Sequence, residues 1–279
     1  MIEQLGRRCA LVLLASMSLA TLMGLMAWGP VLLSSQAHDY ADSRAWLGIP
    51  GAANVWVNLA MLAVGTWGWR VTRASSWPPQ LRTPWQLFQV CAVVFALLAA
   101  LYHRWPGDTL LVTAHAATAG GFMMLTLGML AERVHPRFGS SLSCGLLLLV
   151  AALWAGAMLI GHSLGNPIDM RPLLLLEIIP VLVIPAGALS LPGGATRVLD
   201  WIVVLSLYAL AKVLESSDAL ILQTSGWVSG HTLMHLALTA AVGWMAYCAA
   251  RARTALTPSG SAKVSGDLSH RETSLNTSG

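Results

Sequence analysis

Two histidines four residues apart form the part of the sequence best suited to chemistry. His231 and His235 lie in the segment SGHTLMHLA, inside an apolar run that predicts a helix. Residues four apart lie on one helix face, one turn from each other, so both imidazoles can reach one metal ion. His103 is the third candidate ligand. Three histidines and one open position are typical of a catalytic zinc site, where the metal polarises a carbonyl and activates water.

Two other interpretations of these histidines stay open at this point. An i, i+4 pair can hold helices together through hydrogen bonds, with no metal involved. Haem-based electron transfer is a weaker alternative. It would use His103 and one histidine of the pair as axial ligands on opposite sides of the macrocycle.

The elements that must position these histidines are predicted to be transmembrane helices. Apolar residues make up 56% of the 279-residue chain and charged residues 10%, whereas soluble domains carry about 25% charged residues. Runs of about 20 mostly apolar residues indicate membrane spans. They occur near 9–29, 52–70, 86–104, 109–130, 142–160, 172–191, 199–221 and 230–250. The sequence therefore predicts an all-α integral membrane protein of eight spans.

The chain divides into three predicted regions. Residues 1–37 form an N-terminal transmembrane helix or signal anchor, with a signal peptide cleaved after Ala37 as the alternative. Residues 38–250 form the helical core. Residues 251–279 are rich in Ser, Thr and Gly and are predicted to be a disordered cytoplasmic tail.

The distribution of basic residues predicts the orientation of the spans. With a cytoplasmic N-terminus, twelve Lys and Arg fall on the cytoplasmic side and three on the other, while Lys212 lies inside the seventh span. Such asymmetry is typical of cytoplasmic loops. We expect a multi-pass protein of the bacterial inner membrane with both termini cytoplasmic. The basic residues form no contiguous patch, which excludes nucleic acid as a partner.

This orientation, derived from Lys and Arg alone, places the candidate ligands at one depth. His103 ends the third span, and His231 and His235 open the eighth, all at the outer end. Glu215 and Asp218 close the seventh span there, and Lys212 with Glu215 predicts either an ion pair or support for a metal ligand. The histidines predicted to be ordinary solvated residues are His38, His135, His162 and His270.

Three segments resemble the alkaline ceramidases, especially their bacterial phytoceramidase-like membrane relatives. They are YALAKVLESSDALILQTSGWVSGHTLMHLA (208–237), HDYADSRAWLGIPGAANVWVNLAMLAVG (38–65) and ALYHRWPGDTLL (100–111). The resemblance covers most of 38–250 and implies a seven-helix core to which the first span is an addition. It also implies a zinc-dependent amide hydrolase acting on a ceramide-like membrane lipid, with zinc held by His103, His231 and His235. It implies no protein partner.

The chain departs from this family at two positions. A serine expected four residues before the first histidine is Ala99, and an aspartate expected eleven residues after it is Ala114. The missing base would cost about 10²–10⁴-fold in rate, and the missing oxyanion donor about 10²–10³-fold. Glu215 is the best alternative base by depth and chemistry. The departures also favour a second reading, a catalytically impaired pseudoenzyme or sensor that binds zinc and lipid.

Overall fold

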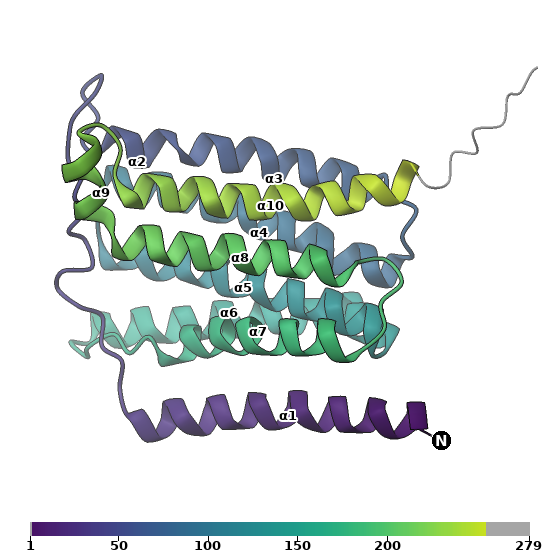
Figure 1. Ribbon diagram of the computed structural model, residues 1–279. Helices are drawn as coiled ribbons and strands as arrows, with labels where there is room; N and C mark the ends of the chain where they lie inside the picture. The colour runs from purple at the N-terminus through teal and green to yellow at the C-terminus, as the bar shows by residue number, and fades with distance from the viewer. Residues whose placement is uncertain (1, 255–279) are drawn as a thin grey trace, which may run out of the picture.

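The computed structural model describes residues 2–254, and their regular structure is helical apart from two isolated bridge pairs. The longer helices lie side by side as a bundle (Figure 1). In chain order the elements are α1 (Ile2–Trp28), α2 (Ala52–Trp56), α3 (Asn58–Arg73), α4 (Pro79–Arg104), α5 (Asp108–Arg133), the 3-10 helix η1 (Pro136–Gly139), α6 (Ser141–Ser163), α7 (Arg171–Ser190), α8 (Val198–Ser216), α9 (Asp218–Ser225) and α10 (Gly230–Thr254).

Six of the described helices are long and apolar enough to cross a membrane: α1, α4, α5, α6, α7 and α10. The protein is therefore a multi-pass membrane protein. The other two predicted spans are broken helices. The second divides at Val57 into α2 and α3, and the seventh divides at Ser217 into α8 and α9. The count of eight spans, and the division into seven plus one, remain predictions.

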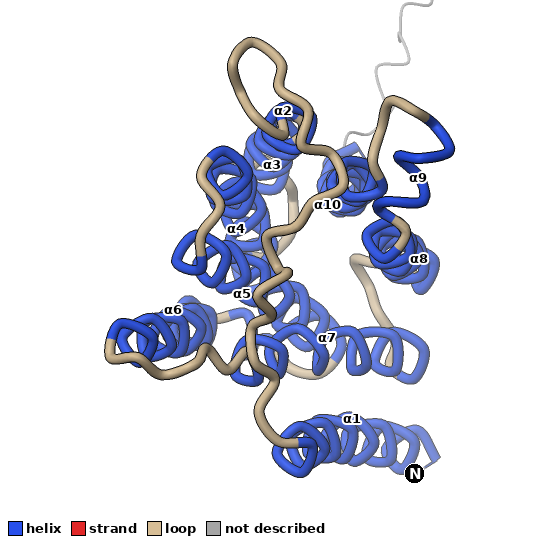
Figure 2. The backbone as a smooth tube through the Cα atoms, turned by 90° about the vertical axis from the view of Figure 1, so that its left-hand side faces the viewer, coloured by secondary structure: helices blue, strands red, loops and turns tan. Residues whose placement is uncertain are grey.

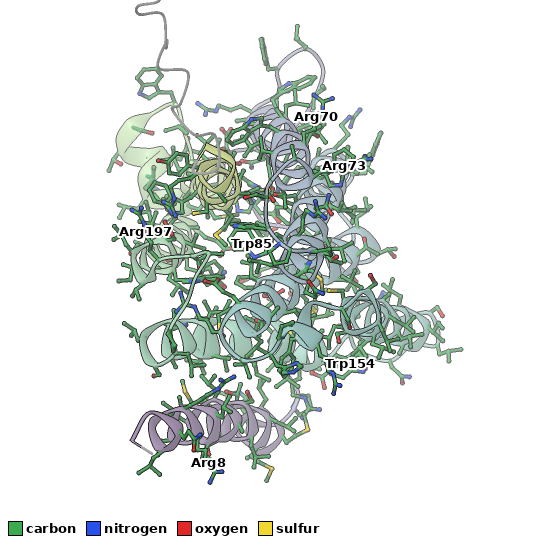
Figure 3. All side chains as sticks on the ribbon, turned by 90° about the vertical axis from the view of Figure 1, so that its right-hand side faces the viewer. Arg8, Arg70, Arg73, Trp85, Trp154 and Arg197 are labelled. Carbon is green, nitrogen blue, oxygen red and sulfur yellow. The ribbon has the colours of Figure 1, made fainter. Side chains whose placement is uncertain are left out.

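Both ends of the described chain lie at the same end of the bundle (Figure 1). Figure 3 looks onto this end, over which Arg8, Arg70, Arg73 and Arg197 are spread. Their presence at one end agrees with the predicted asymmetry of charge, although the compartment that this end faces stays a prediction. Helix α10 continues to Thr254, four residues into the predicted tail. The rest of that tail, with His270, lies outside the described residues.

The core of the bundle surrounds α5, which packs against α4, α6 and α7, while α10 packs against α3 and α8. Large side chains without exposed surface fill it, including Trp85, Trp201, Met124 and Met245. Burying each such side chain contributes roughly 1.5–3 kcal/mol where water is the reference. Helix α1 contacts α7 and is otherwise mostly exposed, as expected of a peripheral span.

Buried polar contacts fix the bundle at the arginine-rich end. The Glu132 carboxylate accepts hydrogen bonds from the backbone N–H groups of Ala195 and Thr196, at 2.9 and 2.8 Å. Asp200 at the start of α8 forms an ion pair of 2.6 Å with Arg251 near the end of α10. A buried carboxylate with such partners is satisfied, so these contacts hold the helix ends in register. They keep α8 beside α10, and both helices reach the histidines at the other end.

Candidate metal centre

The structure brings together the three histidines predicted from sequence. His103 lies in the last turn of α4, and His231 and His235 lie in the first turns of α10. The three Nε2 atoms are each 3.2 Å from the other two. All three side chains are buried. Nearly perpendicular ring planes, at 76° to 81°, let the three nitrogens converge on one point.

Hydrogen bonding alone does not account for this triangle. Each Nε2 of a neutral imidazole either carries a proton or presents a lone pair. Among three nitrogens at least two are of the same kind, so at least one of the three contacts joins two donors or two acceptors. A buried contact of that type is unfavourable. A cation at the centre would instead accept a lone pair from every nitrogen.

The spacing also fits a metal ion. Zinc–nitrogen bonds of about 2.0–2.1 Å at tetrahedral angles place two nitrogen ligands about 3.3–3.4 Å apart, close to the 3.2 Å found here. The group His103, His231 and His235 can therefore hold a metal ion. Haem does not fit, because the nitrogens converge and leave no room for a macrocycle between any two of them.

Aromatic rings hold the histidines in place. Tyr40, from the connection between α1 and α2, lies 4.8 Å from the His103 ring and 4.3 Å from the His231 ring between centroids. Phe95 of α4 stacks on His235 at 5.8 Å. The Nδ1 atom of His235 is buried without a hydrogen-bond partner among the described residues. Packing therefore orients this ring, whereas metal-bound histidines are usually oriented by a second hydrogen bond.

Asp218 joins the start of α10 to the segment that covers the site. One carboxylate oxygen accepts the backbone N–H of His231 at 2.7 Å, and the other accepts the backbone N–H of Ala41 at 3.0 Å. The approach needs a glycine at 230, because a Cβ there would lie 2.1 Å from the Leu214 carbonyl oxygen. Asp218 therefore fixes the backbone of His231, a candidate metal ligand.

Substitution Asp218→Asn is expected to weaken metal binding about 10–100-fold, the usual effect of losing a contact that supports a ligand. An amide has one accepting oxygen, so its NH₂ group would face the N–H of either His231 or Ala41. Competition with a chromogenic chelator measures the affinity. Asp39→Asn, an exposed loop change, is the control, and equal affinities in the two variants would refute the role of Asp218.

The connection between α1 and α2 crosses the end of the bundle where α10 begins (Figure 2), and its Tyr40 contacts the rings of His103 and His231. Arg44 fixes it by donating hydrogen bonds to the backbone carbonyls of Gly226 and Trp227, at 3.0 and 2.7 Å. The same guanidinium hydrogen-bonds Asp42 and holds the pKa of that carboxyl below its usual range. The Asp42 carboxylate is therefore charged at neutral pH, and the Arg44 contacts persist.

One histidine predicted to be solvated, His38, is instead engaged in this region. It is half-buried and contacts Tyr102 at 2.8 Å and Asp108 at 3.0 Å. The expectation was wrong for His38 because it treated the connection as a free loop. His162, in the last turn of α6, lies 3.3 Å from the other oxygen of Asp108 but is exposed, as predicted. His135 is exposed and accepts the backbone N–H of Arg137, which is consistent with the prediction.

The histidines open into a cavity of about 140 Å³, here called the metal cavity. Ala99 and Ala114 both line this cavity, so methyl groups face it at the two positions where the resemblance predicts a serine and an aspartate. Glu215 lines it too, but its carboxylate forms an ion pair with Lys212. His115 and Glu177 add a second pair, 3.3 Å apart. Its other lining residues are Tyr40, Phe95, Tyr102, Leu111, Thr118, Phe122, Tyr208, Ala211, Met234 and Leu238.

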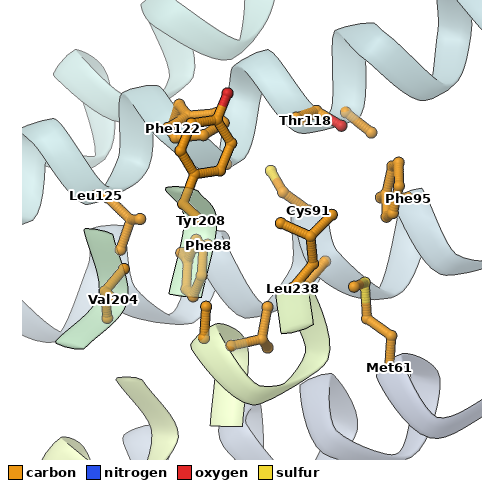
Figure 4. A pocket seen from close by; sticks show the side chains of 15 residues that line it. Met61, Phe88, Cys91, Phe95, Thr118, Phe122, Leu125, Val204, Tyr208 and Leu238 are labelled. Atoms are coloured by element: carbon orange, nitrogen blue, oxygen red, sulfur yellow. The ribbon is translucent and has the colours of Figure 1, made fainter. Parts of the chain in front are cut away.

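A second cavity, here called the apolar pocket, continues from the metal cavity toward the middle of the bundle (Figure 4). The two share Phe95, Phe122 and Leu238, among other residues. Deeper in the bundle the apolar pocket is lined by side chains such as Phe88 and Val204. A ligand with a polar group at the histidines and an apolar chain below them matches this pair of cavities.

Sequence reasoning missed Tyr40, Tyr102 and His38 as residues of this region. Tyr102 directly precedes a predicted ligand, and its position could have drawn attention to it. Comparisons of the chain with known protein families, with characterised proteins and with solved structures return no match.

Proposed function

We propose that the protein is a zinc-dependent hydrolase that cleaves an amide bond in a membrane lipid. The observation that carries the proposal is a buried three-histidine group that opens directly onto an apolar pocket within a membrane bundle. The resemblance of the segments around His103 and His231 to alkaline ceramidases favours a ceramide-like substrate.

Neutral histidines would hold the metal through Nε2, a donor set well suited to zinc. When bound there, zinc supplies polarisation of a carbonyl and activation of water. The chain's own residues do the rest. Tyr40 covers two of the histidine rings. The apolar pocket would hold an acyl chain so that the adjoining amide carbonyl lies in the metal cavity. Glu215 remains an alternative base, although Lys212 already neutralises its carboxylate.

A second candidate function is a zinc-holding protein that binds or senses a lipid without turnover. The alanines at 99 and 114 favour it, because both line the metal cavity and neither can hydrogen-bond through its side chain. This candidate predicts bound zinc and bound lipid with no product. The orientation that we propose places the metal cavity at the outer face of a bacterial inner membrane.

The test starts from detergent-purified protein prepared without chelators. Metal is measured by mass spectrometry, and release of fatty acid is measured with ceramide and with a lipid ester of matched chains. Zinc with release from the amide supports the hydrolase. Zinc with retained, uncleaved lipid supports the second candidate. Protein that takes up neither zinc nor another divalent metal would rule out both.

Blocking the passage between the two cavities is expected to weaken activity on long-chain lipids. Leu238 lines both cavities, so Leu238→Trp would fill their junction. A misfit of one methylene in an apolar pocket typically costs about 1–3 kcal/mol, which corresponds to about 10–200-fold in discrimination between substrates. The rise in KM should be larger for long acyl chains than for short ones. Leu236→Trp, at an exposed position of the same helix, is the control. Equal KM values across chain lengths would contradict the acyl site.

A further inference from the structure

We propose that His38 is the proton acceptor of the metal cavity, reached through Tyr102 and Tyr40 and oriented by Asp108. The proposal rests on the hydrolase function proposed above. It answers a specific difficulty of that function, because Ala114 leaves the metal cavity without the expected carboxylate base.

A continuous chain of hydrogen bonds joins the metal cavity to the outer end of the bundle. Tyr40 and Tyr102 both line the metal cavity, and their hydroxyl oxygens are 2.9 Å apart. The Tyr102 hydroxyl lies 2.8 Å from Nδ1 of His38. Nε2 of His38 lies 3.0 Å from Asp108, whose carboxylate is one-third exposed. Each separation is that of a hydrogen bond, so a proton can pass along the chain without any group moving far.

The chemistry of the partners sets the direction of these bonds. The Asp108 carboxylate can only accept, so Nε2 of His38 carries the proton. In a neutral imidazole Nδ1 is then an acceptor and takes the O–H of Tyr102. The Tyr102 oxygen in turn accepts the O–H of Tyr40. Both O–H bonds therefore point along the chain toward His38, which leaves a lone pair of the Tyr40 oxygen to receive a proton.

The tyrosines carry protons and hold no charge. Each tyrosine takes up one proton for every proton that it passes on, along the contacts of 2.9 and 2.8 Å described above. The imidazole of His38 is suited to end the chain, because its Nδ1 can accept a proton and Asp108, 3.0 Å from Nε2, would stabilise the imidazolium.

The step balances as an amide hydrolysis. The oxygen of water forms the new bond to the carbonyl carbon, and one of its protons passes to Tyr40. Tyr40 gives its own proton to Tyr102, which gives its own to Nδ1 of His38. Both tyrosines end neutral. When the C–N bond breaks, the same path returns a proton to the leaving nitrogen, so the products are a carboxylic acid and an amine. The Tyr102 hydroxyl has a second acceptor, the Ala37 carbonyl at 3.0 Å, toward which it can turn once His38 is charged.

The other titratable pairs of the metal cavity are less suited to this role. Glu215 is neutralised by Lys212. His115 and Glu177 form a dyad of 3.3 Å, which is longer than each contact of the chain. The groups that face His38 itself are Tyr102 from α4 and Asp108 from α5, with His162 from α6 on the far oxygen of Asp108.

The test uses full-length protein and two readouts. The first is kcat for amide cleavage in His38→Gln, which keeps polar contacts but cannot take a proton, and in Tyr102→Phe, which keeps the ring. We expect kcat to fall about 10²–10⁴-fold in both variants, with zinc content and KM unchanged. His135→Gln, which alters a histidine bound only to the Arg137 backbone, is the matched control and should retain activity.

The second readout does not depend on activity. The ¹⁵N spectrum of histidine-labelled protein, assigned with His38→Gln, should show neutral His38 protonated at Nε2 and accepting at Nδ1. The opposite tautomer would overturn the proposal, as would an unchanged kcat in His38→Gln. A loss of turnover in His115→Gln but not in His38→Gln would assign the role to the His115–Glu177 dyad and also overturn it. Zinc-loaded wild type that cleaves no lipid amide refutes the hydrolase instead, a result that the tautomer measurement keeps separate.

Discussion

Replacing His231 and His235 by alanine is expected to remove the metal and all amide hydrolysis from the protein. Purified wild type should hold about one zinc per chain, as expected for one three-histidine site, and the double variant should hold none. The reason is geometric. The three Nε2 atoms lie 3.2 Å apart, so two alanines leave a single ligand on α4. One imidazole does not retain zinc against solvent and buffer.

The control for this result is a double variant that leaves the triangle intact. His135→Gln with His162→Gln also removes two histidines, but both lie away from the metal cavity. It should retain zinc and show a circular dichroism spectrum like that of wild type. Equal zinc in the two double variants would mean that the metal binds elsewhere. No divalent metal in wild type would mean that the histidines are structural.

The three-histidine group could be predicted because two independent patterns in the sequence agree. The i, i+4 spacing of His231 and His235 fixes one helix face, and the charge asymmetry of the loops fixes membrane depth. Depth selected His103 from the remaining histidines. The structure brings these three side chains together in α4 and α10. Long apolar runs likewise predicted the six helices that can cross a membrane.

The parts that escaped prediction depend on contacts between distant segments. His38 and Tyr40 lie in a connection without regular periodicity, so nothing local shows that they reach Tyr102 and the histidines. The break between α8 and α9 was missed because the apolar residues on either side of Ser216–Asp218 were treated as one run over 199–221. Only the structure shows that Asp218, at this break, turns its carboxylate to the start of α10. Hydropathy indicates which residues can lie in lipid, but it does not indicate where a helix breaks within an apolar run.

Position 114, where the resemblance predicts an aspartate and the chain has alanine, allows a direct test of the proposed chemistry. Ala114→Asp is expected to restore activity to His38→Gln, because a carboxylate at a position that lines the metal cavity can take the proton without the tyrosine chain. The rescue should recover much of the loss of about 10²–10⁴-fold and should raise wild type only slightly. Ala114→Asn has nearly the same size and is no base at neutral pH, so it is the control. Zinc content must stay constant, since a new carboxylate near the histidines could also become a ligand.

Each pattern of rescue corresponds to one account of the metal cavity. Rescue of His38→Gln with little change in wild type means that wild type already has a base, supplied through Tyr40 and Tyr102. A rise of about 10²–10⁴-fold in wild type itself means that the natural chain lacks a base, as the lipid-binding alternative requires. No effect in either background, with zinc bound, means that water is not activated beside Ala114. The substitution at Ala114 thus distinguishes a hydrolase that uses His38 as its base from a lipid-binding protein that has no base. The two accounts differ chemically in whether a base already serves the cavity beside Ala114.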